Sequence, residues 1–115
     1  MGANIKVVKL HSAKREDEVH RMSVNLFNKG VVGETRFASC DHGTYLTGGK
    51  VQPHQPEHLK EIFYFTRGTG IFTLDGKEIP IKAGSAFVVP PRSVHSIVNT
   101  GDDILQHVVC STVVP

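Results

Sequence analysis

The feature that most constrains the fold of this chain is a series of short β-prone runs separated by turn residues. From Val24 onward, runs rich in Val, Ile, Phe, Tyr and Thr are interrupted by Gly and Pro at intervals of about ten residues. These runs predict strands at residues 24–28, 34–39, 43–51, 60–66, 69–74, 77–82, 85–90, 94–98 and 104–114. Because no long helical pattern competes with them, we expect an all-β chain whose short antiparallel strands form a sandwich, a jelly roll or a small barrel.

Local signals divide the chain further. Asp75-Gly76 predicts a two-residue hairpin turn of type I′, in which both central residues need positive φ. The segment from His11 to Met22 is polar and charged without a sustained apolar stripe, which predicts a solvated arm or a short helical turn. We therefore expect one domain over residues 1–115, with an N-terminal arm at 1–23 and a β-barrel at 24–114.

Composition limits the class of protein and its partners. With 115 residues, of which 39% are hydrophobic and 21% charged, the chain can bury a core of its own and is not expected to be disordered. The net charge of +2 is spread along the sequence, so neither a nucleic acid nor an anionic membrane is expected as a partner. The sequence has no signal peptide and no apolar run of about 20 residues, which favours a cytoplasmic location.

Two stretches contain residues that could bind a metal or take part in catalysis. Residues 49–68 contain His54, His58 and Glu61, and residues 84–99 contain His95. Imidazoles combined with a carboxylate suit Mn, Fe, Co, Ni, Cu or Zn. Glu61 also begins a row of alternate apolar residues, and a carboxylate on a buried face needs a partner such as a cation.

The second stretch resembles the cupin superfamily. It matches the family pattern G-x5-P-x-G-x2-H-x3-N at Gly84, Pro90, His95 and Asn99, with Arg92 at the middle Gly. The first stretch is similar to G-x5-H-x-H-x3,4-E-x6-G. There, Glu61 and Gly68 match, His54 falls on the first His, and Pro56 stands in place of the second His. Over residues 40–114 the resemblance implies a double-stranded β-helix, or jelly-roll barrel, that brings the two motifs together.

The resemblance also implies a site. Its metal ligands would be His54, His58, Glu61 and His95, and its substrate-binding residues would be Gln52, Phe63 and Phe87. His58 could replace the missing motif His because Pro53 and Pro56 bend the backbone, or it could be a solvent-facing loop residue.

The function implied is that of a divalent-metal-dependent enzyme of the isomerase, lyase or dioxygenase class, acting on a small polar or carboxylated metabolite. A homodimer is expected from the same family. Since Pro56 replaces a motif His, two alternatives stay open. One is a metal-free epimerase, cyclase or dehydratase, and the other is a non-catalytic small-ligand binding module.

Four further residues are left with alternatives. His42 is either a general base at the barrel mouth or an exposed turn residue. His107 follows Gln106 in the last predicted strand, and alternation sends one of the two inward. Cys40 and Cys110 are most simply small buried hydrophobes, with a reactive thiol or a disulfide as the alternatives.

Overall fold

The computed structural model describes the backbone of residues 15–18, 20–28 and 36–114, and the side chains of 20–28 and 36–114 apart from Gln52 and His54. This part of the chain consists of strands and turns. The strands are β1 (Arg15–Glu18), β2 (Arg21–Asn28), β3 (Phe37–Tyr45), β4 (Lys50–His54), β5 (Leu59–Arg67), β6 (Thr69–Leu74), β7 (Lys77–Lys82), β8 (Ala86–Val89), β9 (His95–Val98) and β10 (Leu105–Val113). None of the described residues is helical, so none belongs to a helix that could cross a membrane.

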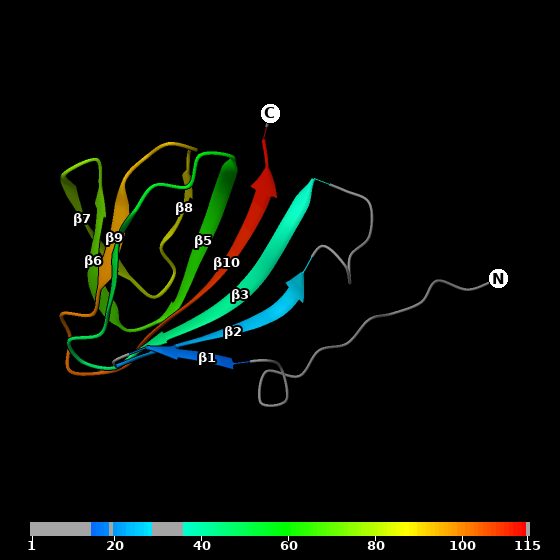
Figure 1. The fold of residues 1–115 in the computed structure, drawn as a ribbon. Coiled ribbons are helices and arrows are strands. Elements are labelled where there is room, and N and C mark those ends of the chain that lie inside the picture. Colours follow the sequence, from blue (N-terminus) through cyan, green and yellow to red (C-terminus); the bar gives the residue numbers. More distant parts are fainter. Residues whose placement is uncertain (1–14, 19, 29–35, 115) are drawn as a thin grey trace.

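The strands form two antiparallel sheets. One has six strands in the order β1-β2-β3-β10-β5-β8, and the other has four in the order β4-β9-β6-β7. In Figure 1 the four-stranded sheet stands at the left and the six-stranded sheet at the right. This arrangement confirms the all-β prediction and matches a jelly-roll barrel.

The core lies between the two sheets because alternate residues of each strand point inward. On β5, Phe63 and Phe65 are buried, whereas Ile62 and Tyr64, on either side of Phe63, are half exposed. The buried hydrophobic cluster draws on both sheets and consists of Tyr45, Phe63, Phe65, Phe72, Ile81, Val89, Ile97 and Leu105.

The β6–β7 hairpin confirms the turn prediction. Asp75 and Gly76 have φ values of 48° and 81°, and Leu74 pairs directly with Lys77. The side-chain carboxylate of Asp75 also accepts a hydrogen bond of 2.8 Å from the backbone N–H of Val94, which ties the turn to the segment before β9.

The expectation for residues 11–22 is wrong where the structure describes them. Residues 15–18 form β1, and β2 begins at Arg21 rather than at Val24. Both strands extend the six-stranded sheet, because β1 pairs with β2 and β2 pairs with β3. Their polar sequence hid the strand signal, since ladder pairing with a neighbouring strand supplies the backbone hydrogen bonds whatever the side chains are.

The expected strands at 34–39 and 43–51 also need correction. A single strand, β3, runs from Phe37 to Tyr45, and a turn at residues 47–48 separates it from β4. The turn contains Gly48 at a φ of 78°. Residues 34 and 35 lie outside the described residues. The sequence Asp41-His42-Gly43 looks like a turn, but these residues pair along their length with β10 and β2.

Asn99 joins three parts of the barrel. Its side-chain amide donates to the carbonyl oxygens of Tyr45 and Asp103, at 2.9 and 2.8 Å, and its side-chain oxygen accepts from the N–H of Gly101. The residue is only 1% exposed. The motif asparagine is therefore a structural clamp that fixes the end of β3 against the turn between β9 and β10.

Candidate functional site

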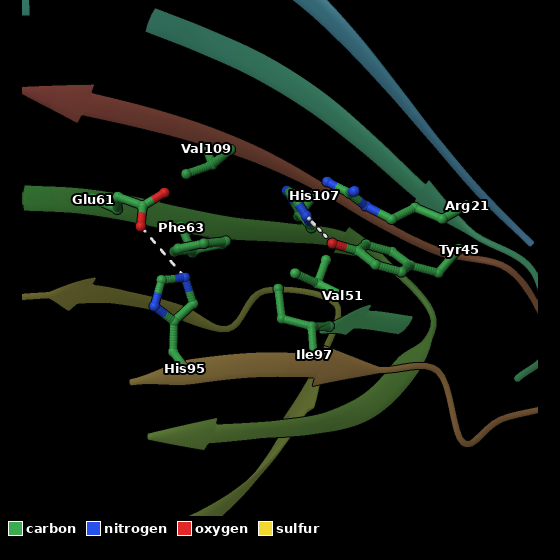
Figure 2. A pocket seen from close by; sticks show the side chains of 9 residues that line it. All are labelled: Arg21, Tyr45, Val51, Glu61, Phe63, His95, Ile97, His107 and Val109. Atoms are coloured by element: carbon green, nitrogen blue, oxygen red, sulfur yellow. Dashed lines mark hydrogen bonds and ion pairs between the residues drawn. The ribbon is translucent and has the colours of Figure 1, made fainter. Parts of the chain in front are cut away.

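A cavity of about 70 Å³ lies between the two sheets. Figure 2 shows its side chains, with Glu61 and His95 at one end and Arg21, Tyr45 and His107 at the other. The remaining lining is apolar and is formed by Val51, Phe63, Ile97 and Val109. The cavity therefore joins two polar ends through an apolar middle.

Glu61 and His95 form the first polar end. Nε2 of His95 lies 3.3 Å from Oε1 of Glu61, and the two side chains are 1% and 15% exposed, respectively. The His95 ring stacks on Phe72, with centroids 5.6 Å apart and planes 7° apart, and meets the edge of Phe63. Because aromatic rings hold the imidazole, Nε2 is fixed in its orientation toward the carboxylate.

The spacing of this pair fits two ligands of one cation. Ligand atoms bound at about 2.0–2.1 Å lie roughly 2.8–3.4 Å apart in octahedral or tetrahedral geometry. The Glu61–His95 separation of 3.3 Å falls in that range. A carboxylate oxygen and an imidazole nitrogen are also donors that divalent transition metals accept.

The other two predicted ligands differ in position. His54 lies on β4 with its backbone directly opposite His95 in the ladder, and its side chain is outside the described residues. The His58 side chain is 69% exposed and lies 3.9 Å from the carboxylate of Glu57, so the structure does not bring it to Glu61 and His95. His58 belongs to the bend that precedes β5, and its side chain is exposed there beside Glu57. Among the side chains that the structure describes, no three of His, Cys, Asp and Glu gather closely enough to hold a metal ion.

The predicted substrate-binding residues also separate. Phe63 lines the cavity, whereas Phe87 packs into the core with its ring 4.4 Å from that of Phe72. The side chain of Gln52, on β4, is outside the described residues.

His107 and Tyr45 form the second polar end with Arg21. The Tyr45 hydroxyl lies 2.9 Å from Nε2 of His107, and both residues are almost fully buried. Burial, followed by the charges of Arg21 and His42, lowers the pKa of His107 to about 3. The Arg21 guanidinium carbon lies 5.7 Å from the centre of the Tyr45 ring. The imidazole is therefore neutral at physiological pH and lies at the same end of the cavity as the Arg21 guanidinium.

Gly43 makes room for the His107 ring. A Cβ at this position would come within 2.7 Å of Cε1 and Nε2 of His107. Gly43 and His107 are directly paired on β3 and β10, so the ring lies over the glycine. Of the two residues whose orientation the sequence left open, His107 points inward, and Gln106 donates a hydrogen bond to the hydroxyl of Thr44.

His42, Cys40 and Cys110 lie on the opposite face of the six-stranded sheet. His42 is within β3 and does not line the cavity described above, and burial lowers its pKa. Cys40 and Cys110 are free thiols opposite each other in the β3–β10 ladder. Burial and the adjacent Cys110 thiol raise the pKa of Cys40 to about 12, which keeps that thiol protonated.

Arg21 and Tyr45 are the residues of this site that sequence reasoning missed. Arg21 fell in the segment expected to be an arm, and Tyr45 fell inside a run expected to continue to residue 51. The sequence Gly43-Thr44-Tyr45 at the end of β3 was the one local hint of this end of the cavity. Only the pairing of β3 with β10 places Gly43 and Tyr45 beside His107.

Comparisons with known proteins agree with this fold. A family model described as "Cupin domain" matches residues 42–110. An oxalate-binding protein from Thermotoga maritima is 41% identical over 59 residues, which cover 51% of this chain and 49% of that protein. An uncharacterized protein from Methanocaldococcus jannaschii is 34% identical over 64 residues, covering 56% and 51% of the two chains. The chain thus spans about half the length of the curated relatives it matches.

A solved structure extends the comparison to nearly the whole chain. The crystal structure of a predicted oxalate decarboxylase from Thermotoga maritima superposes with a TM-score of 0.86 at 25% identity, covering 95% of this chain and 100% of the other. The family model covers more than half of the present sequence and includes Glu61, His95 and His107. From its sequence and its fold, this chain belongs to the cupin family.

Proposed function

We propose that this cupin binds a divalent transition-metal ion through Glu61, His95 and His54, and uses it to hold a small carboxylate-bearing metabolite in the cavity. The observation that carries the proposal is the buried Glu61–His95 pair, whose donor atoms face each other at 3.3 Å on the cavity wall. His54 is included because its backbone is paired with that of His95.

The residues of the cavity have distinct parts in this function. The Glu61 carboxylate neutralises part of the charge of a cation, and the stacking of His95 on Phe72 keeps the imidazole in place. The apolar part of the lining lowers the local dielectric constant, which strengthens electrostatic contacts to a bound ligand. When bound, the cation would supply Lewis acidity toward the oxygens of the substrate.

A carboxylate is favoured as ligand for two reasons. Arg21 adds a positive charge at the far end of the cavity. In addition, one similar protein is called oxalate-binding and a similar structure is called a predicted oxalate decarboxylase. The reaction, of the isomerase, lyase or dioxygenase class, is proposed on the basis of family membership.

Metal content tests the proposal most directly. Untagged protein purified without chelators is analysed by inductively coupled plasma mass spectrometry, together with Glu61→Gln and His95→Ala. We expect close to one metal ion per chain in the wild type and none in either variant. The exposed residues His58 and Glu78 provide matched controls, and His58→Ala and Glu78→Gln should retain the metal. Circular dichroism verifies that every variant is folded.

The opposite result would redirect the proposal. If the wild type holds no metal even after incubation with Mn, Fe, Co, Ni, Cu and Zn, the metal-dependent function is wrong. Isothermal titration calorimetry with oxalate then shows whether the metal-free protein binds a carboxylate. Binding would support the metal-free alternatives, and no binding would exclude a carboxylate ligand of this kind.

We also propose that the chain forms a homodimer through the outer face of the six-stranded sheet. Ile62, Tyr64 and Val88 are 48%, 50% and 53% exposed, respectively, and Ile62 pairs directly with Val88 across β5 and β8. Exposed apolar side chains gathered on one sheet face are typical of an interaction surface. The cytoplasmic location stays a prediction from the sequence.

A further inference from the structure

The end of the cavity remote from Glu61 and His95 is built by three adjacent strands. Arg21 on β2 pairs directly with Tyr45 on β3, and Gly43, two residues before Tyr45, pairs with His107 on β10. In Figure 2 the side chains of Arg21 and His107 lie near the Tyr45 hydroxyl, to the right of the Glu61–His95 pair. The ladder therefore holds the phenol, the imidazole and the guanidinium in a fixed arrangement.

The position of the His107 proton decides what the Tyr45 hydroxyl can do. Nδ1 of His107 is buried and, within the described part of the chain, has no hydrogen-bond partner. A buried N–H without an acceptor is rarer than a buried acceptor without a donor, so we assign the hydrogen of the neutral ring to Nε2. Nε2–H then donates to the Tyr45 oxygen at 2.9 Å. The hydroxyl hydrogen of Tyr45 is consequently directed away from His107.

Charge and size indicate what this end of the cavity binds. The Arg21 guanidinium, with its carbon 5.7 Å from the Tyr45 ring centre, favours negative charge nearby. The cavity volume of about 70 Å³ has room for roughly five waters, since one water needs about 10–15 Å³ of such a cavity. A ligand of a few non-hydrogen atoms with an anionic oxygen at this end satisfies both conditions.

We propose that Tyr45 is a ligand-binding residue that determines specificity, because its hydroxyl donates a hydrogen bond to an anionic oxygen at the end of the ligand remote from Glu61 and His95. His107 is the positioning residue that orients the Tyr45 hydroxyl, and Gly43 leaves the space that the His107 ring occupies. The inference rests on the proposed function for the ligand class, a small carboxylate. It deepens that function by requiring oxygens at both ends of the ligand, so a dicarboxylate such as oxalate binds more tightly than a monocarboxylate such as acetate.

The chain offers a matched control because it has only two tyrosines, Tyr45 in the cavity and Tyr64 on the outer face. Metal-reconstituted wild type, Tyr45→Phe and Tyr64→Phe are titrated with oxalate and with acetate by isothermal titration calorimetry. A hydrogen bond to a charged group changes affinity roughly tenfold to hundredfold. We expect Tyr45→Phe to lose that factor for oxalate, with little change for acetate, and Tyr64→Phe to match the wild type for both.

A second measurement leaves the residue in place. Labelling the tyrosine Cζ carbons with ¹³C gives two resonances, which Tyr64→Phe assigns. The Cζ shift reports hydrogen bonding of the phenol, so oxalate should move the Tyr45 resonance and leave the Tyr64 resonance unchanged. If the Tyr45 resonance does not move when oxalate binds, the inference is wrong whatever Tyr45→Phe does to folding.

The positioning role of His107 is tested by rescue. The side-chain N–H of glutamine can replace Nε2–H, whereas phenylalanine cannot. His107→Gln should therefore keep the preference for oxalate over acetate, and His107→Phe should lose it. Equal preference in the two variants would overturn the positioning role.

Metal content, measured on the same samples, separates this inference from the proposed function. If the wild type is metal-free yet binds oxalate more tightly than Tyr45→Phe does, the metal proposal fails and the role of Tyr45 holds. If the wild type binds metal while Tyr45→Phe binds oxalate as tightly as the wild type, the metal proposal holds and the role of Tyr45 is wrong. Absence of oxalate binding by the wild type overturns the role of Tyr45.

Discussion

His107 makes the stability of the fold depend on pH. In the unfolded chain its pKa is near the ordinary value of 6.5, whereas burial in the folded chain lowers it to about 3. Between these values the unfolded chain binds one more proton. The free energy of unfolding should therefore be highest above the ordinary pKa and should fall by about 1.4 kcal/mol for each pH unit toward the lowered one.

Urea unfolding of metal-free protein across that pH range provides the measurement. The contribution of His107 is the difference in slope between the wild type and His107→Gln, which has no titratable group at this position. A slope shared by wild type and His107→Gln would mean that His107 titrates normally in the folded state.

Single residues also mark where sequence reasoning reached its limit. The convergence of Glu61 and His95 was expected from the resemblance alone, because the two motifs lie on strands that the family brings together. The role of Gly43 was not predicted, because a side chain at this position would collide with the ring of His107, which lies 64 residues later in the chain. Such contacts between distant segments have no local sequence signal.

At the scale of the strand, Asn99 connects elements that share no turn. Replacing it with alanine leaves the carbonyl of Tyr45 and the N–H of Gly101 without their present partners. We expect Asn99→Ala to lower the free energy of unfolding by about 2–3 kcal/mol, because buried polar groups are left unsatisfied. Urea denaturation measures the loss, and the exposed neighbour provides a control in Thr100→Ala, which should stay within about 0.5 kcal/mol of the wild type. Equal stability of the two variants would contradict the clamp.

The strands differ in how well their sequences predict them. From residue 59 onward the observed strands lie within one residue of the expected ranges at each end, since β-branched and aromatic residues alternate and Asp75-Gly76 fixes a hairpin. β1 has the sequence REDE, which carries no apolar alternation, and its strand state depends on pairing with β2. The N-terminal strands were therefore beyond local prediction, and with them Arg21.

For the whole molecule, the exposed apolar face of the six-stranded sheet predicts self-association. The double variant Ile62→Lys/Val88→Lys introduces two like charges on directly paired residues of this face. Size-exclusion chromatography with light scattering should find a dimer for the wild type and a monomer for the variant. Glu78→Lys, on the four-stranded sheet, should remain dimeric. A monomeric wild type at every concentration would exclude this interface.

The Glu61–His95 contact joins the two halves of the barrel. Glu61 belongs to the six-stranded sheet and His95 to the four-stranded sheet, so a species held by both residues must dissociate before the sheets can part. By mass action, a ligand at a hundred times its Kd adds about 2.7 kcal/mol to the free energy of unfolding. The melting temperature of this barrel is thus a direct reporter of occupancy. A thermal-shift screen of cations and organic acids can identify what the cavity accepts without knowledge of the reaction.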